Sequence, residues 1–353
     1  MSGRHVLLLA LPVLAGLGFL REATAGQGPE TVYQIPIRGD IELGLAPFVE
    51  RSLAEAQSQG AAAVILDIET PGGRVDAAQR IANAIGDAAV PVYAFVNRHA
   101  YSAGALIALA ADKIYMREES VMGAATPVVG SGEKAPEKIV SAMRAQMRAL
   151  AEARGLDPAV AAAMVDEDIE IEGVVEAGKL LTLTASEAVT LGYAQVVADR
   201  GALFEAEGLT GAPVQVMQVN WAERIVRFLS NPVVAPFLLS LGFLGLIAEI
   251  KSPGIGFAGF AGVLSLALFF GSHLILGLAG MEDLLLIAGG LVLIGVEVFV
   301  IPGFGLFGVL GGIGVLGGVY MSMIGSIPTV PDFAQAGAVL STSVLIILIT
   351  SWA

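Results

Sequence analysis

The sequence predicts an α/β domain followed by an all-α membrane domain, and three observations support this. The mean hydropathy of +0.76 is too high for a soluble protein of 353 residues. Charge is unevenly distributed, because residues 231–353 contain one lysine and five acidic residues whereas residues 26–230 contain sixteen basic and twenty-seven acidic ones. The charged part alternates short β-rich runs with helical stretches, an order that favours a largely parallel sheet.

The composition excludes several classes of function. The net charge of −14 comes without basic clusters, which argues against nucleic-acid binding. The absence of cysteine excludes disulfides, thiolate metal sites and a cysteine nucleophile. Two GxGxxG strings, at residues 254–259 and 303–308, lie between apolar runs and lack the βαβ context of a dinucleotide site. We therefore expect no metal and no cofactor.

Residues 1–25 have the pattern of a signal peptide. Arg4 supplies the positive charge, residues 6–20 the apolar run, and Ala23-Thr24-Ala25 an A-x-A cleavage site. The alternative is an uncleaved anchor helix, although the run is short for a membrane span. In both cases the following domain is expected on the exported, periplasmic side.

Residues 26–220 form the predicted α/β domain, in which strands and helices alternate from the start. Periodicity predicts strands at residues 33–37, 62–68, 91–96 and 113–116. It predicts helices between them at residues 41–59, 75–88 and 102–111. Loops at the strand ends are then the expected place for a functional site.

The second half of this domain is predicted to be helical and then β-rich. We expect a long helix at residues 138–154, a shorter one at 159–165 and a small β-rich piece at 170–184. The apolar side of the long helix, around Met143 and Met147, suits packing on the core or on a second subunit. Together with the resemblance given below, it leads us to expect a homo-oligomer.

The chain then changes from an aqueous to a lipid environment. Residues 221–232 are predicted as a linker whose helix, at residues 221–229 with Arg224 and Arg227 opposite Phe228, lies at the membrane surface. Residues 233–353 are predicted as a multi-pass domain of about four to five spans in contact with lipid, at 233–249, 257–279, 283–301, 304–325 and 336–352. An internal repeat relates residues 253–259 to residues 302–308, 49 positions later.

Ser102, in Tyr101-Ser102-Ala103-Gly104, is the predicted nucleophile. It follows a strand and opens an apolar helix, where a hydroxyl is exposed and the helix N-terminus is electropositive. The alternative is a simple helix N-cap serine. Histidine is almost absent from the chain, so lysine is left as the base by elimination. Lys138 is the first choice and Lys134 the rival, and burial would have to lower the lysine pKa.

Small residues around Ser102 suit the binding of a peptide backbone. Gly72-Gly73 directly follows a buried strand and can present bare amides as an oxyanion hole, with the Ala103 amide as second donor. The alternative is a plain strand-to-helix turn. We expect substrate contacts at three glycines, Gly72, Gly104 and Gly123.

The ordered set of motifs resembles the long form of the NfeD family, membrane-bound serine proteases with a ClpP-like domain of the crotonase superfamily. The motifs are Thr70-Pro71-Gly72-Gly73, Tyr101-Ser102-Ala103-Gly104, residues 122–128, Ala135-Pro136-Glu137-Lys138, residues 181–188 and residues 231–236. The resemblance implies Ser102 as nucleophile, Lys138 as general base, and the Gly73 and Ala103 amides as the oxyanion hole. It also implies a β-α superhelix and a substrate or partner of the stomatin (SPFH-like) type.

Two features depart from the family pattern. Glu69 stands where a small polar residue such as Asn or Asp is expected, which bears on substrate contacts. The family's long form ends in an OB-like β-barrel, whereas this sequence ends at Ala353, so we expect the barrel to be absent or supplied separately.

The leading hypothesis is therefore a Ser-Lys endopeptidase of the cell membrane that cleaves apolar segments of stomatin-like proteins. One alternative is a signal-peptide-peptidase-like enzyme, and another is a crotonase-like acyl-CoA enzyme. The non-enzymatic alternative is a membrane scaffold that binds stomatin-like proteins without cleaving them.

Overall fold

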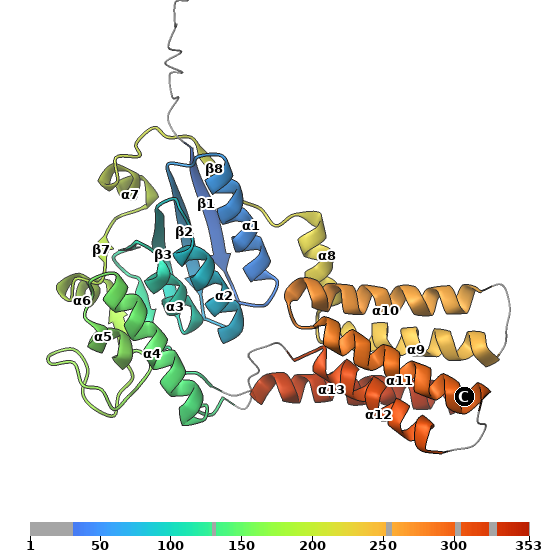
Figure 1. Cartoon of the computed structure of the whole chain (residues 1–353). Helices are drawn as coiled ribbons and strands as arrows, with labels where there is room; N and C mark the ends of the chain where they lie inside the picture. The colour runs from blue at the N-terminus through green and yellow to red at the C-terminus, as the bar shows by residue number, and fades with distance from the viewer. Residues whose placement is uncertain (1–30, 129–131, 252–255, 301–304, 325–329, 353) are drawn as a thin grey trace, which may run out of the picture.

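The computed structural model describes residues 31–128, 132–251, 256–300, 305–324 and 330–352. The predicted signal peptide lies outside the described residues, as do residues 253–255 and 302–304 of the internal repeat. Within the described residues, an α/β region precedes a bundle of apolar helices that extends to one side of it (Figure 1).

The α/β region is built on one sheet of eight strands. The hydrogen-bonded order is β6-β5-β3-β2-β1-β8, and β4 joins β3 to β7. All pairings are parallel except the one between β5 and β6. The strands are β1 (Val32–Arg38), β2 (Ala63–Thr70), β3 (Val92–Tyr101), β4 (Lys113–Met116), β5 (Val121–Gly123), β6 (Thr182–Thr184), β7 (Gln195–Val196) and β8 (Val214–Val216). The largely parallel sheet expected from the sequence is confirmed.

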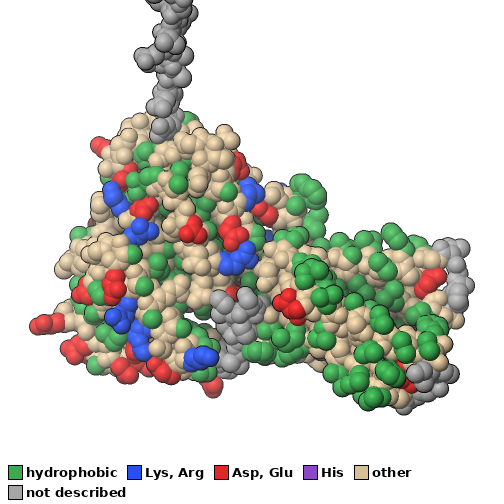
Figure 2. All heavy atoms as spheres, in the orientation of Figure 1, with side chains coloured by type: hydrophobic (Ala, Val, Ile, Leu, Met, Phe, Trp, Pro, Cys, Tyr) green, Lys and Arg blue, Asp and Glu red, His purple; other side chains and the backbone are tan. Residues whose placement is uncertain are grey.

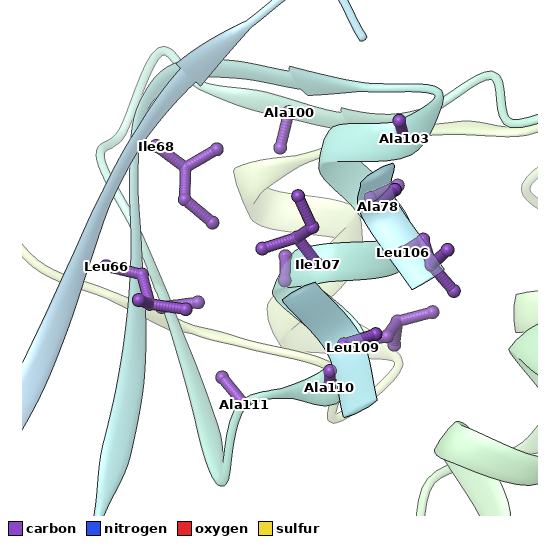
Figure 3. Close-up of a cluster of buried hydrophobic side chains, with 14 of the residues drawn as sticks. Leu66, Ile68, Ala78, Ala100, Ala103, Leu106, Ile107, Leu109, Ala110 and Ala111 are labelled. Carbon is purple, nitrogen blue, oxygen red and sulfur yellow. The ribbon is translucent and has the colours of Figure 1, made fainter. Parts of the chain in front are cut away.

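The core lies between the central strands and the helices that connect them. Strand β2 is buried on both faces, as expected for a parallel strand covered by helices. Helix α3 (Ala103–Ala110) is buried along its whole length, and its Ile107 points toward Leu66 and Ile68 of β2 (Figure 3). The other helices of this region are α1 (Leu45–Ser58), α2 (Val75–Gly86), α4 (Glu137–Ala153), α5 (Pro158–Ala163), α6 (Ala185–Thr190) and α7 (Arg200–Ala206).

Two expectations for this region need correction, and one open alternative is decided. The first helix begins at Leu45 and not at Ile41, because Ile41 forms a backbone bridge with Gly73. Residues 170–184 are mostly turns, with only β6 and an isolated bridge between Ile171 and Val175. Met143 and Met147 pack in the core of this chain, which confirms the first of the two alternatives given for them and removes their support for a homo-oligomer.

The helical region begins with α8 (Trp221–Leu229), at the predicted position, and continues as a bundle. Its helices are α9 (Ala235–Lys251), α10 (Phe257–Leu276), α11 (Met281–Phe299), α12 (Leu306–Met321) and α13 (Val330–Trp352). Apolar side chains cover the visible surface of this bundle, whereas charged ones gather on the α/β region (Figure 2). Among the described residues, two stretches are long and apolar enough to cross a membrane, Phe257–Leu276 and Asp332–Thr350.

The predicted internal repeat appears as two similar helical hairpins. A Cβ on Gly262 of α10 would lie 2.7 Å from the carbonyl oxygen of Gly242 in α9. A Cβ on Gly311 of α12 would lie 2.6 Å from the carbonyl oxygen of Gly290 in α11. Each hairpin therefore depends on small residues for close helix contact.

Polar contacts fix the α/β region to the helices that follow it. Arg51 of α1 pairs with Glu223 of α8 at 2.6 Å, and Glu42 pairs with Arg227 of the same helix. These pairs bind the polar face of α8, so its apolar face points away from the α/β region and leaves Trp221 73% exposed.

Candidate active site

Ser102 lies at a sharp turn between β3 and α3. Its backbone angles are φ 52° and ψ −118°, and its N–H donates to the carbonyl oxygen of Gly123 at 2.8 Å. Its own carbonyl oxygen accepts the first helical bond, from the Ala105 N–H at 2.9 Å. The hydroxyl has no hydrogen-bond partner among the described residues, and the side chain is partly exposed.

This backbone conformation is the main evidence that Ser102 is more than a helix cap. A positive φ is uncommon for residues other than glycine and costs about 1–3 kcal/mol. Its hydroxyl also makes no capping bond to the helix. A serine held at a strained strand-to-helix turn, with its hydroxyl free, has the geometry of a nucleophile elbow.

Gly72 lies against the Ser102 side chain. A Cβ on Gly72 would come within 2.6 Å of the Ser102 Cβ and 3.2 Å of its Oγ, and the φ of Gly72 is 107°. Both the space and the backbone conformation therefore require glycine at this position. The glycine pair predicted to border the nucleophile is indeed next to it.

The Gly73 amide is available as a hydrogen-bond donor. Ile41 bonds to the residues on either side, because its N–H donates to the Gly72 oxygen at 2.8 Å and its oxygen accepts from the Arg74 N–H at 2.7 Å. In a parallel bridge of this kind the N–H of the residue in between points away from its partner. No described residue accepts from the Gly73 N–H.

The Ala103 amide is the second available donor. It is the first residue of α3, and the first N–H groups of a helix have no partner within it. No hydrogen bond of this N–H to a described residue occurs. One bare amide thus directly follows Ser102, and the other directly follows Gly72, which packs on the Ser102 side chain. Unpaired amides beside a nucleophile are groups that can stabilise a developing oxyanion.

Two residues that hold this site were assigned no role from the sequence. The Thr70 hydroxyl donates to the Gly39 oxygen at 2.6 Å and accepts from the Gly72 N–H at 3.0 Å. Ile41 fixes the other side of the glycine pair through its backbone. The role of Thr70 could have been inferred, because Thr70 belongs to the Thr70-Pro71-Gly72-Gly73 motif. Nothing local in the sequence indicates the bridge of Ile41.

Gly104 and Gly123 have packing roles in the structure, and their substrate contacts stay a prediction. A Cβ on Gly104 would lie 2.5 Å from the Thr70 methyl group, and the residue is buried. A Cβ on Gly123 would lie 2.6 Å from the Leu181 oxygen. These two glycines allow α3 and β6 to approach the site closely.

Lys138 makes no hydrogen bond to Ser102 in the described part of the chain. It lies in the first turn of α4 and is exposed, so the burial expected for a neutral lysine base is not present. Within the described residues it also has no ion pair, unlike the other lysines of this domain. Those pairs are Lys113 with Glu207, Lys134 with Glu167, and Lys179 with Glu176.

Lys134, the rival base, is held in its charged form. Its ammonium donates to Glu167 at 3.1 Å, and this hydrogen bond raises its pKa above the ordinary value. His99 is no substitute, because it stacks on Tyr101 at 5.2 Å between ring centroids and has no hydrogen bond to Ser102. Glu69, the departure from the family pattern, accepts from Asn97 at 2.8 Å.

The described residues contain no cluster of histidine, cysteine, aspartate and glutamate that could hold a metal ion. Fold and site together define a membrane protein whose α/β region carries a strained serine beside two bare amides.

The chain belongs to the NfeD family. Residues 31–217 match the family described as "NfeD1b, N-terminal domain", and residues 233–353 match the "NfeD integral membrane domain". The chain is 43% identical to "Membrane protein NfeD1b" of Bacillus subtilis over 312 residues, which is 88% of this chain and 70% of that protein.

A more distant relative has a name that states an activity. The chain is 28% identical to "Membrane-bound protease PH1510" of Pyrococcus horikoshii over 248 residues, 63% of this chain and 54% of that protein. Among solved structures, a variant of the "1510-N membrane-bound stomatin-specific protease" is 26% identical, with a TM-score of 0.48. That match covers 55% of this chain and 100% of the solved one.

Proposed function

We propose that this protein is a membrane-anchored serine endopeptidase with a ClpP-like catalytic domain. The observation that carries the proposal is the strained Ser102 with its free hydroxyl beside the bare amides of Gly73 and Ala103. A helix cap or a plain turn does not need the positive φ of Ser102. The relative named a membrane-bound protease supports the same activity.

In the proposed reaction, the Ser102 hydroxyl attacks a peptide carbonyl while the neutral amine of Lys138 takes its proton. The Gly73 and Ala103 amides donate to the carbonyl oxygen as it becomes negative. The ammonium of Lys138 then protonates the leaving amine, the C–N bond breaks, and an acyl-enzyme remains. Water hydrolyses the ester, and Lys138 again transfers the proton.

Lys138 remains the proposed base although it is exposed. A general base must release its proton near neutral pH, and a carboxylate partner would oppose this by stabilising the ammonium. Lys138 has no such partner among the described residues, whereas Lys134 has Glu167. Lys138 therefore needs only to be covered and brought to Ser102, and we propose that bound substrate or a second subunit does this.

The proposed substrate is an apolar segment of a stomatin-like membrane protein, as the family resemblance implies. We further propose that the chain crosses the membrane several times and that the α/β domain lies on the exported side. Arg74, which follows Gly73, contacts Asp332 of α13, so in this proposal a segment leaving the bilayer would pass near Ser102.

A non-catalytic scaffold is the second candidate, and the exposure of Lys138 without a hydrogen bond to Ser102 favours it. Cleavage of an apolar peptide from a stomatin-type C-terminus by the full chain in detergent separates the two. We expect cleavage by the wild type, none by Ser102→Ala or Lys138→Ala, and cleavage by the matched control Lys134→Ala.

The outcomes distinguish the parts of the proposal. Full activity of Ser102→Ala would refute the protease assignment. Loss of cleavage in Lys134→Ala but not in Lys138→Ala would make Lys134 the general base in place of Lys138. Stable binding of the peptide by wild type and Ser102→Ala alike, without any product, would establish the scaffold.

A further inference from the structure

Arg74 connects the glycine pair beside Ser102 to the helical bundle. It directly follows Gly73 and is the N-cap residue of α2. Its guanidinium binds Asp76 of α2 through two hydrogen bonds, of 3.0 and 2.7 Å, and binds Asp332 of α13 at 2.6 Å. One side chain thus joins the proposed oxyanion loop, residues 70–74, to the first turn of a candidate membrane span.

This contact is buried and electrostatically strong. The Asp332 side chain is 2% exposed, and Arg74 is three-quarters buried. Burial alone would lower the pKa of Arg74, but the carboxylates of Asp76 and Asp332 outweigh it and raise the pKa above its ordinary value. Removing one partner of a buried pair leaves an uncompensated charge, so the pair strongly favours this one arrangement.

A second link reaches the loop from its other side. Ile41, which bonds to both neighbours of Gly73, is followed by Glu42, and Glu42 is paired with Arg227 of α8. Both sides of the Gly73 peptide are therefore connected to helices of the membrane region. The loop needs such support, because its two glycines, with φ of 107° and 150°, have no side chains to hold them.

We propose that the membrane region positions the oxyanion hole, with Asp332 as a positioning residue that acts through Arg74 on the Gly73 amide. The inference rests on the proposed protease function. A donor amide works only if it is aimed at the oxyanion, and a misplacement of about 1 Å costs about 100-fold in rate. The helical bundle is then part of the catalytic apparatus as well as an anchor.

The test compares Asp332→Asn with two other variants in the full-length protein in detergent. Asp332→Asn removes the charge at constant size, and Asp332→Glu restores it. Asp283→Asn is the matched control, because Asp283 is also a buried carboxylate in the first turn of an apolar helix, α11. Within the part of the chain that the structure describes, it accepts a hydrogen bond from the Gly280 N–H at 2.9 Å and has no ion pair.

The measured quantities are kcat, KM, inhibition by a peptide boronate and labelling of Ser102 by a fluorophosphonate. We expect Asp332→Asn to lower kcat by about 10- to 100-fold with KM within about twofold, and to weaken the boronate by a similar factor. Asp332→Glu should recover most of kcat, and Asp283→Asn should match the wild type. A merely structural role would not change kcat and boronate affinity together.

Three results would overturn the inference, and they can be told apart. If a folded Asp332→Asn variant keeps the wild-type kcat and boronate affinity, and Ser102 is labelled normally, this inference is refuted while the proposed function stands. If Asp332→Asn does not fold, Arg74→Gln serves instead, and unchanged amide hydrogen exchange in residues 70–74 of that variant refutes it. Failure of the wild type to be labelled at Ser102 refutes the proposed function, and the inference with it.

Discussion

Replacement of Ser102 by glycine should abolish activity and at the same time stabilise the protein. Ser102 has φ 52° and ψ −118°, a conformation that glycine adopts without cost. Relief of the strain is worth about 1–3 kcal/mol. The greater freedom of glycine in the unfolded chain offsets about 0.4–1 kcal/mol of this gain. With the midpoint of each range, the net stabilisation is about 1.3 kcal/mol.

The appropriate reference is Ser102→Ala and not the wild type, because both variants lack the hydroxyl and only alanine keeps the Cβ. For a domain of this size, about 1.3 kcal/mol corresponds to a Tm higher by about 3–5 °C. The tyrosine band of the near-UV circular dichroism spectrum reports mainly on this domain, since five of the six tyrosines lie in it. The tryptophan bands are not used, because both tryptophans lie outside the domain.

A second glycine variant tests the reasoning away from the nucleophile. Ala124 also has a positive φ, of 50°, so Ala124→Gly should raise the Tm by a similar amount. If Ser102→Gly melts at or below the temperature of Ser102→Ala, the turn is not strained, and the elbow assignment of Ser102 loses its main support.

Two further predictions concern the ends of the α/β region. Burial alone would raise the pKa of Glu207, but hydrogen bonds from Lys113 and Tyr115 outweigh burial and lower this pKa below the ordinary 4.5. The ionised Glu207 therefore stabilises the folded protein above about pH 4.5, and this stabilisation is lost as the pH falls through the lowered pKa. Glu207→Gln should therefore lower the free energy of unfolding at pH 7 by about 1–3 kcal/mol, measured by urea titration. It should also make this free energy depend less on pH in the acid range, and an unchanged dependence there would contradict the prediction. The second prediction concerns α8, whose Trp221 is the sole tryptophan in a Trp352→Phe variant. Because the exposed apolar face of α8 is expected at the membrane surface, the fluorescence of Trp221 in vesicles should be quenched by shallow spin-labelled lipids and not by aqueous iodide. The reverse pattern would place the apolar face of α8 in water.

The elements with strong local signals could be predicted from the sequence. The strand Lys113–Met116 and the helix Trp221–Leu229 have the predicted bounds. The helix is delimited by Asn220, which caps it reciprocally with Glu223, and by the end of its apolar face. Neighbours within a few residues decide such features, and periodicity therefore suffices to find them.

Features that depend on distant residues could not be predicted. Residues 41–44 have helical periodicity, but the bridge between Ile41 and Gly73 draws them into the site and delays the helix to Leu45. The contact of Arg74 with Asp332 joins residues more than 250 positions apart. The exposure of Lys138 likewise depends on tertiary surroundings, which an inspection of its neighbours in the sequence does not reveal.

Two acidic residues of the helical hairpins, Glu249 in α9 and Glu297 in α11, illustrate how tertiary contacts explain a feature of the sequence. A carboxylate in an apolar helix is compatible with a polar relay. In the structure, Glu249 accepts from the Gly259 N–H at 3.1 Å, and Glu297 accepts from the Gly305 and Gly308 N–H groups at 2.8 and 3.2 Å. These amides lie at or near the N-termini of α10 and α12, where donors lack helical partners and negative charge is favoured. The same carboxylate-to-amide contact closes both hairpins, so repetition of the acid follows from repetition of the fold, and no relay is needed to account for it.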